Sequence, residues 1–130
     1  MYDKELILSH LQNIENSLKD IINWTEDIDS IDDFLTSKDG MILMNAVCMK
    51  LIAIGEEVKG LDKHTDKKLL AQYPDIQWKD IMGMRDIIVH HYFFDIDTEK
   101  VFEAIQNDVP KLHTVIEKMI KENYLISNKI

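Results

Sequence analysis

The chain has 130 residues, of which 45% are hydrophobic and 30% are charged, with four glycines and two prolines. This length suits one domain with a single core, and the composition excludes collagen-like and low-complexity proteins. Fifteen Lys and Arg residues against 24 Asp and Glu residues give a net charge of −9. That charge disfavours a nonspecific nucleic-acid coat protein, which needs a broad basic surface.

Several kinds of site and location are also excluded by the sequence. The single cysteine, Cys48, rules out an internal disulfide and a cysteine zinc site. Residues 1–11 mix charged side chains with apolar ones, so we expect no signal peptide. No apolar run approaches the roughly 20 residues of a membrane span. We therefore expect a soluble cytoplasmic protein.

A first amphipathic helix is predicted over about residues 3–27, with Asp3 as its N-cap. Its apolar residues alternate between spacings of four and three, which places them on one face. After a polar break, Ser30 is expected to cap a short helical turn that carries Phe34. The apolar stripe of the first helix consists of Ile7, Leu11, Ile14, Leu18 and Ile21.

A second long helix is predicted from Ser37 or Asp39 to about residue 58, and Gly60 is expected to stop it. Gly55 lies inside this helix, where a glycine costs about 0.5–1 kcal/mol relative to alanine. Close approach of another helix is the usual compensation, and it is a better explanation of Gly55 than a ligand contact. The apolar stripe consists of Met44, Val47, Leu51, Ile54 and Val58.

The second half of the chain predicts three more helical segments, at about residues 63–72, 75–90 and 99–122. Pro110 falls inside the last apolar stripe, and proline has no N–H to donate to the preceding turn. A kink or break is therefore expected near residues 107–109.

The fold class follows from these elements. No segment alternates with period two for long enough to form a strand. We predict an all-α, antiparallel up-and-down bundle with four principal helices plus short helices. One domain is expected over residues 1–122, with residues 123–130 as a frayed tail.

Arg85 is the only arginine in the chain, and it lies in the segment with the strongest chemical signal. There is no phosphate-binding glycine loop, no His-Glu-x-x-His motif and no serine nucleophile elbow elsewhere. The planar guanidinium group matches a phosphate with two hydrogen bonds. Arg85 is therefore either a phosphate ligand or one half of an ordinary ion pair with a nearby carboxylate.

His90 is the second candidate, because imidazole gives and takes protons near neutral pH. Asp86 lies four residues before it, so its carboxylate can orient or charge the ring. Arg85 and His90 are five residues apart, roughly 140° around a regular helix. They converge on one phosphate only if the helix ends near His90 or a second copy of the helix faces the first. The spacing thus favours a site at a dimer interface.

Other residues give weaker signals. His91 adjoins His90, but adjacent helical residues point apart, so no metal site is expected. One local cluster of basic residues could touch RNA phosphate, although on so acidic a chain a solvated face is the better interpretation. This basic cluster consists of Lys59, Lys63, His64, Lys67 and Lys68.

The pattern Arg85-x4-His90-x-Tyr92 resembles the signature of the HepT-like branch of HEPN domains, the toxins of HEPN and minimal nucleotidyltransferase toxin–antitoxin pairs. Further segments match the usual order of the family, from about Asp3 to Met119. These segments are Ile54-Gly55-Glu56, Tyr73-Pro74-x-Ile76-x-Trp78, Ile81-x-Gly83-x-Arg85 and Asp108-x-Pro110-x-Leu112, together with Phe34.

The resemblance implies a helical homodimer that cleaves RNA without a metal ion or other cofactor. Arg85 would bind and polarise the scissile phosphate, and His90 would act as general acid or base for attack by the RNA 2′-hydroxyl. Tyr92 would receive AMP from a cognate nucleotidyltransferase antitoxin, whose added charge would block RNA. The alternative is a non-catalytic module that binds a nucleotide or substrate for its nucleotidyltransferase partner.

Asp86 departs from the family pattern, where asparagine is the commoner residue after the motif arginine. A carboxylate adds negative charge where a phosphate should bind. It would either stabilise the charged imidazole of His90 or neutralise Arg85. We therefore expect Asp86 to modulate the site.

Overall fold

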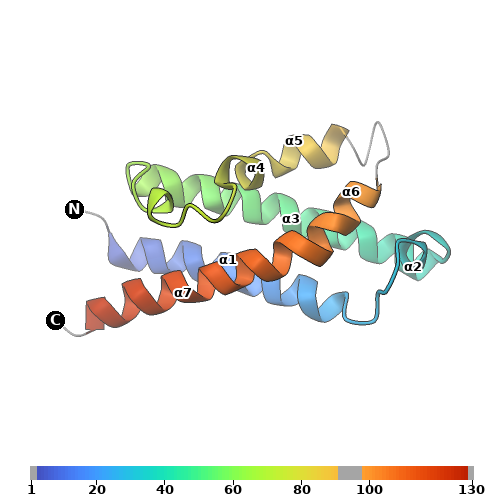
Figure 1. Cartoon of the computed structure of the whole chain (residues 1–130), viewed down its shortest axis with the longest axis horizontal. Coiled ribbons are helices and arrows are strands. Elements are labelled where there is room, and N and C mark those ends of the chain that lie inside the picture. Colours follow the sequence, from blue (N-terminus) through green and yellow to red (C-terminus); the bar gives the residue numbers. More distant parts are fainter. Residues whose placement is uncertain (1–2, 91–97, 129–130) are drawn as a thin grey trace.

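The computed structural model describes residues 3–90 and 98–128, and every regular element in these two ranges is a helix, as predicted. Long helices run up and down in antiparallel order, so α1 begins and α7 ends at the same end of the bundle (Figure 1). None of the described helices is long and apolar enough to cross a membrane. The elements are α1 (Lys4–Trp24), α2 (Asp32–Leu35), α3 (Lys38–His64), η1 (Leu70–Gln72), α4 (Trp78–Met82), α5 (Met84–Ile88), α6 (Thr98–Glu103), η3 (Ala104–Asp108) and α7 (Val109–Asn128).

The core is formed by the apolar stripes that the sequence predicted. α1 packs against α3 and α7, while α4 and α5 pack against α3. All five stripe residues of α1 and all five of α3 are buried. Two of the predicted caps are present. The Asp3 carboxylate accepts hydrogen bonds from the amides of Glu5 and Leu6. Of the alternatives Ser37 and Asp39, Ser37 caps α3, and its hydroxyl accepts a hydrogen bond from the amide of Gly40.

Gly60 does not stop α3, which continues to His64. Instead, Gly60 makes room for a side chain from another helix. A Cβ atom on Gly60 would lie 2.8 Å from Cε1 of His10, a residue of α1. The helix ends at Thr65, followed by left-handed backbone at Asp66 and Lys67, which have φ angles of 53° and 61°. The glycine therefore serves helix packing and not helix termination.

The helix predicted over residues 63–72 does not form, because the left-handed turn after α3 interrupts it. Only the short 3₁₀ segment η1 remains of it. The helix predicted over residues 75–90 begins later, at Trp78, and is divided at Gly83 into α4 and α5. The sequence does not reveal the break at Gly83, because Ile81 before it and Met84 and Ile88 after it keep an almost regular helical spacing and all face the core.

Two smaller differences concern helix ends. Ser30 does not cap α2, which begins at Asp32 and has no side-chain cap; instead the Asp33 carboxylate accepts hydrogen bonds from the amides of Asp29 and Ser30. At the other end of the chain, α7 extends to Asn128, through most of the segment expected as a tail.

The irregularity predicted at Pro110 is present as η3, a π-helical segment that ends at Asp108. Proline cannot donate the backbone hydrogen bond that would continue a regular α-helix, and the wider π turn accommodates its absence. Ile105 and Val109 stay buried across this segment, so the break does not take the last helices away from the core.

Candidate functional site

The α4–α5 arm carries the candidate site, and three contacts fix it on the bundle. Its inner residues Ile81, Met84 and Ile88 are buried. The Trp78 indole N–H donates to the carbonyl of Tyr73 over 2.8 Å. A Cβ atom on Gly55 of α3 would lie only 2.6 Å from the carbonyl oxygen of Ile81. Gly55 thus permits α4 to approach α3 closely, which confirms the packing interpretation of this glycine.

A second anchor holds the segment before α4 against α7. The Tyr73 hydroxyl donates to Oε2 of Glu122, and the Lys118 ammonium lies 6.0 Å from the centre of the Tyr73 ring. Burial raises the pKa of Tyr73 to about 12, and the hydrogen bond to Glu122 and the charge of that carboxylate act in the same direction. The α4–α5 arm is therefore tied to α3 on one side and, through Tyr73, to α7 on another.

Arg85, Asp86 and His90 all lie on the outer side of this arm and are exposed. Within the described part of the chain, Arg85 forms no ion pair with a carboxylate, so its guanidinium is accessible. The role of Arg85 as a phosphate ligand stays a prediction. Tyr92, and His91 with it, lie outside the described residues, so the expectations for them remain predictions.

The backbone changes character within the motif. α5 ends at Ile88, and Val89 and His90 are π-helical. The angle of roughly 140° between Arg85 and His90 assumed a regular α-helix, so it does not apply without correction. π-helical turns are rare and are frequently found at functional sites.

The interaction expected between Asp86 and His90 is not formed as a hydrogen bond or ion pair between these two described side chains. Both are exposed, so either can rotate toward the other in solution. The modulating role of Asp86 stays a prediction.

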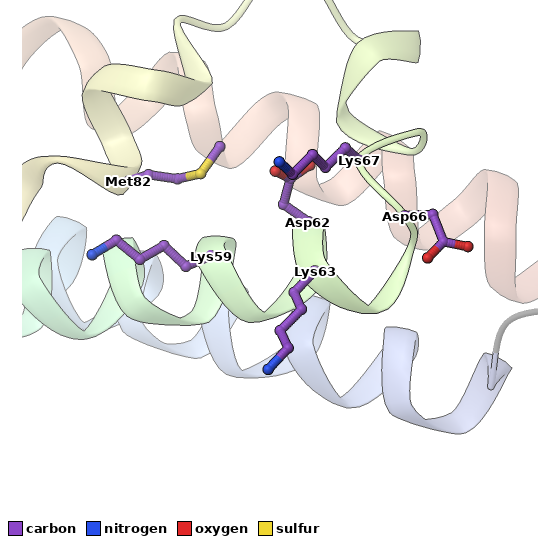
Figure 2. Close-up of a pocket in the computed structure, with 6 residues that line it drawn as sticks. All are labelled: Lys59, Asp62, Lys63, Asp66, Lys67 and Met82. Carbon is purple, nitrogen blue, oxygen red and sulfur yellow. The ribbon is translucent and has the colours of Figure 1, made fainter.

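The basic cluster lines an open hollow of about 400 Å³ next to α4. Lys59, Lys63 and Lys67 contribute to it, but Asp62 and Asp66 lie among them, and Met82 faces it from α4. Figure 2 shows that Lys59 and Lys63 point in different directions. Interspersed carboxylates and diverging ammonium groups make a poor phosphate site, which agrees with the interpretation as a solvated face.

Cys48 offers no nucleophile. Its side chain is buried, and burial raises the pKa of the thiol to about 12, whereas a reactive cysteine needs a lowered pKa. The site expected at Arg85 and His90 therefore stays the prediction for the catalytic residues.

Comparison with known proteins shows the family of the chain. The family model described as ribonuclease HepT-like matches residues 14–119, which include the entire α3 to α5 region. The chain belongs to the HepT-like ribonuclease family. Its resemblance in sequence to that family is thereby confirmed.

Relatives cover nearly the whole HepT-like chain. "Putative RNase MJ0125" of Methanocaldococcus jannaschii is 35% identical over 119 residues, which span 92% of this chain and 95% of the relative. "Putative RNase MJ0127" of the same organism is 34% identical over 92% of this chain and 91% of the relative. "Probable ribonuclease HepT" of Thermococcus cleftensis is 31% identical over 86% of this chain and 94% of the relative. No solved structure shows significant similarity to the chain.

Two polar clusters were missed by sequence reasoning. His10 of α1 bonds Glu57 of α3 at 2.7 Å through Nδ1 and His64 at 3.0 Å through Nε2. The second cluster joins α1 and α7 through Glu15, His113 and Glu117. Both clusters connect residues that are far apart in the chain. The one local signal is Gly60, which makes room for the His10 ring but which the sequence pattern predicts as a helix stop.

Proposed function

We propose that this chain is a metal-independent endoribonuclease, the toxin of a toxin–antitoxin pair that acts on cytoplasmic RNA. The observation that carries the proposal is the exposed Arg85 on α5, within the region that matches the HepT-like ribonuclease family. It is the only arginine of the chain, it has no carboxylate partner among the described residues, and His90 follows it on the same exposed arm.

The proposed chemistry needs only groups of this chain and of the RNA. Arg85 binds the scissile phosphate and stabilises the negative charge that grows on its oxygens in the transition state. The ribose 2′-oxygen attacks phosphorus, the bond to the 5′-oxygen breaks, and a 2′,3′-cyclic phosphate remains. His90 transfers a proton, either from the 2′-hydroxyl or to the departing 5′-oxygen.

We propose a homodimer as the active species. Arg85 and His90 are both exposed on the outside of one arm, and a second copy facing this arm would supply the opposite wall of a cleft. The two-fold axis would bring two arginines and two histidines together. Exposed apolar residues in the N-terminal part of α3 offer a surface for such an interface: Met41, Ile42 and Met49 are 54%, 56% and 64% exposed. Such residues are costly to leave in water if they form a continuous patch.

Inhibition would come from a cognate minimal nucleotidyltransferase that adds AMP to Tyr92. The added phosphate brings negative charge and bulk two residues from His90, and it would compete with RNA for Arg85. This part rests on the resemblance of the motif alone, since position 92 lies outside the described residues.

An RNA digest in EDTA tests the proposal, with wild type, Arg85→Ala and His90→Ala compared. Loss of general acid–base catalysis typically lowers a rate by about 10²–10⁴-fold, and we expect a loss in this range for His90→Ala. Lys79→Ala is the matched control, because it removes a cation from the neighbouring helix α4 outside the motif. We expect it to retain activity.

Three outcomes of the digest would count against the proposal. Equal activity in all variants would indicate a contaminating nuclease. Activity that disappears in EDTA and returns with a divalent ion would contradict metal independence. An inactive wild type that still binds nucleotides would favour the non-catalytic binding module.

A further inference from the structure

Glu15, His113 and Glu117 form a compact group where α1 and α7 pack together, helices that lie side by side in Figure 1. Glu15 comes from α1, while His113 and Glu117 are one turn apart on α7. One nitrogen of the imidazole and one oxygen of each carboxylate lie within 4.8 Å of one another. The group is separate from the α4–α5 arm that carries Arg85 and His90.

The imidazole of His113 lacks the partners that its position requires. Its Nε2 atom is buried and has no hydrogen-bond partner among the described residues. Its Nδ1 atom is 3.4 Å from Oε1 of Glu117, longer than a good hydrogen bond. The side chain is only 21% exposed, so water reaches it poorly. The charges of Glu15 and Glu117 are balanced by a cation at Nδ1, either a proton on the ring or a metal ion bound between Nδ1 and the two carboxylates.

The geometry suits a small transition-metal ion. With metal–ligand bonds of about 2.0–2.2 Å, two ligand atoms of a tetrahedral site lie roughly 3.3–3.6 Å apart. The contact of 3.4 Å between His113 and Glu117 falls in that range. The Glu15 side chain, 20% exposed, completes a set of one nitrogen and two oxygens. An imidazole ligand favours Zn²⁺ over Mg²⁺ or Ca²⁺, which prefer oxygen alone.

We propose that Glu15, His113 and Glu117 bind one Zn²⁺ ion per chain and thereby link α1 to α7. A fourth position remains for water on the exposed side, where Glu117 is 46% exposed. The ion pair between Glu15 and Lys19, at 3.4 Å, gives way on binding. Little opposes this exchange, because Lys19 is 59% exposed and surface ion pairs contribute little to stability.

The ion has a structural role. An ion that binds the folded chain and not the unfolded one raises the melting temperature, by an amount that grows with the logarithm of the free ion concentration above the dissociation constant. Zn²⁺ takes no part in RNA cleavage at Arg85 and His90, so removing it lowers stability and leaves the chemistry intact. The two proposals can therefore fail independently.

The test measures Zn²⁺ binding by calorimetry and the melting temperature of the full chain after treatment with EDTA and removal of the chelator. We expect one Zn²⁺ per wild-type chain and a higher melting temperature in its presence. His113→Gln, Glu15→Gln and Glu117→Gln should each weaken binding at least tenfold. His64→Gln is the control, because it removes an exposed histidine elsewhere. Co²⁺ in place of Zn²⁺ should give the visible absorption of a tetrahedral site in wild type and in His64→Gln, and not in the three ligand variants.

Two results would overturn the proposal. Equal Zn²⁺ affinity in wild type and all three ligand variants would show binding elsewhere on the acidic surface. The second result would be an unchanged melting temperature together with unshifted His113 ring signals in an NMR titration with Zn²⁺. It would show that the three side chains form only an ion-pair group. An unfolded His113→Gln variant would leave the two glutamate variants to decide, since their side chains are partly exposed.

Discussion

At the scale of single residues, Asp86 should affect RNA binding most directly, because it places a negative charge next to Arg85 in the sequence. Asp86→Asn removes this charge without changing the size of the side chain. We expect tighter RNA binding, with a gain that shrinks as salt screens the interaction. The measurement is RNA affinity at two salt concentrations for both proteins.

Asp80→Asn serves as its control, because Asp80 is an exposed acid on α4 outside the motif. The same gain in both variants would indicate a general effect of net charge. No gain in either would show that Asp86 points away from bound RNA.

Tyr73 gives a prediction on stability against pH. The pKa of Tyr73 is raised to about 12 in the folded chain, from an ordinary value of about 10. The unfolded chain therefore loses this proton first, and the stability contributed by Tyr73 is complete below pH 10 and is lost as the pH rises toward 12. Urea unfolding at pH 9, 10 and 11 should show this loss in wild type.

Tyr73→Phe removes the ionisable hydroxyl and its bond to Glu122. At neutral pH we expect a loss of about 1 kcal/mol, typical of one hydrogen bond. Because lysines also titrate above pH 10, the informative quantity is the difference between the two proteins. The difference in the free energy of unfolding between wild type and Tyr73→Phe should narrow from pH 9 to pH 11. A constant difference would contradict the link between the stability of the fold and the ionisation of Tyr73.

At the scale of the elements, Gly55 decides where the α4–α5 arm lies. A methyl group there would meet the carbonyl of Ile81 at 2.6 Å and Cβ of Met84 at 3.4 Å. Overpacking typically costs about 1–3 kcal/mol, while alanine regains up to about 1 kcal/mol of helix propensity. We expect Gly55→Ala to destabilise the fold by about 1–2 kcal/mol and to lower RNA cleavage, because the arm carrying Arg85 is displaced.

Gly60→Ala is the matched control in the same helix. Its new methyl group would meet the His10 ring, which is the end of a side chain and can rotate away, and not the backbone of another helix. We expect this variant to retain RNA cleavage. Chemical denaturation and the EDTA digest check both variants, and equal loss of cleavage in the two would show that Gly55 has no special role in placing the arm.

At the scale of the whole molecule, the homodimer is the prediction with the widest consequence. Sedimentation should give twice the chain mass of 15.2 kDa at micromolar concentration. Met49→Glu should weaken the dimer and lower RNA cleavage together, because the composite cleft needs both copies. Ile22→Glu is the control, since Ile22 is an exposed apolar residue on α1 rather than α3. A monomeric wild type with full activity would refute the composite site.

The sequence alone determined the fold class, the two long apolar stripes and the cap at Asp3, and it limited the cap of the second long helix to Ser37 or Asp39. These features depend on periodicity and on side chains that bond to their own helix, so they are local. The motif around Arg85 was also visible, because a lone arginine five residues before a histidine needs no tertiary structure to be noticed.

Only the tertiary structure decided where the helices end or break and which side chains from different helices meet. Gly60 proved to accommodate His10 from another helix, and the break at Gly83 and the left-handed turn at Asp66 were hidden within favourable helical patterns. The cluster of Glu15, His113 and Glu117 spans about a hundred residues of sequence, and no local pattern announces it. Such features depend on which helices meet and at what distance. The packing of the whole core sets these contacts, and no short stretch of sequence shows them.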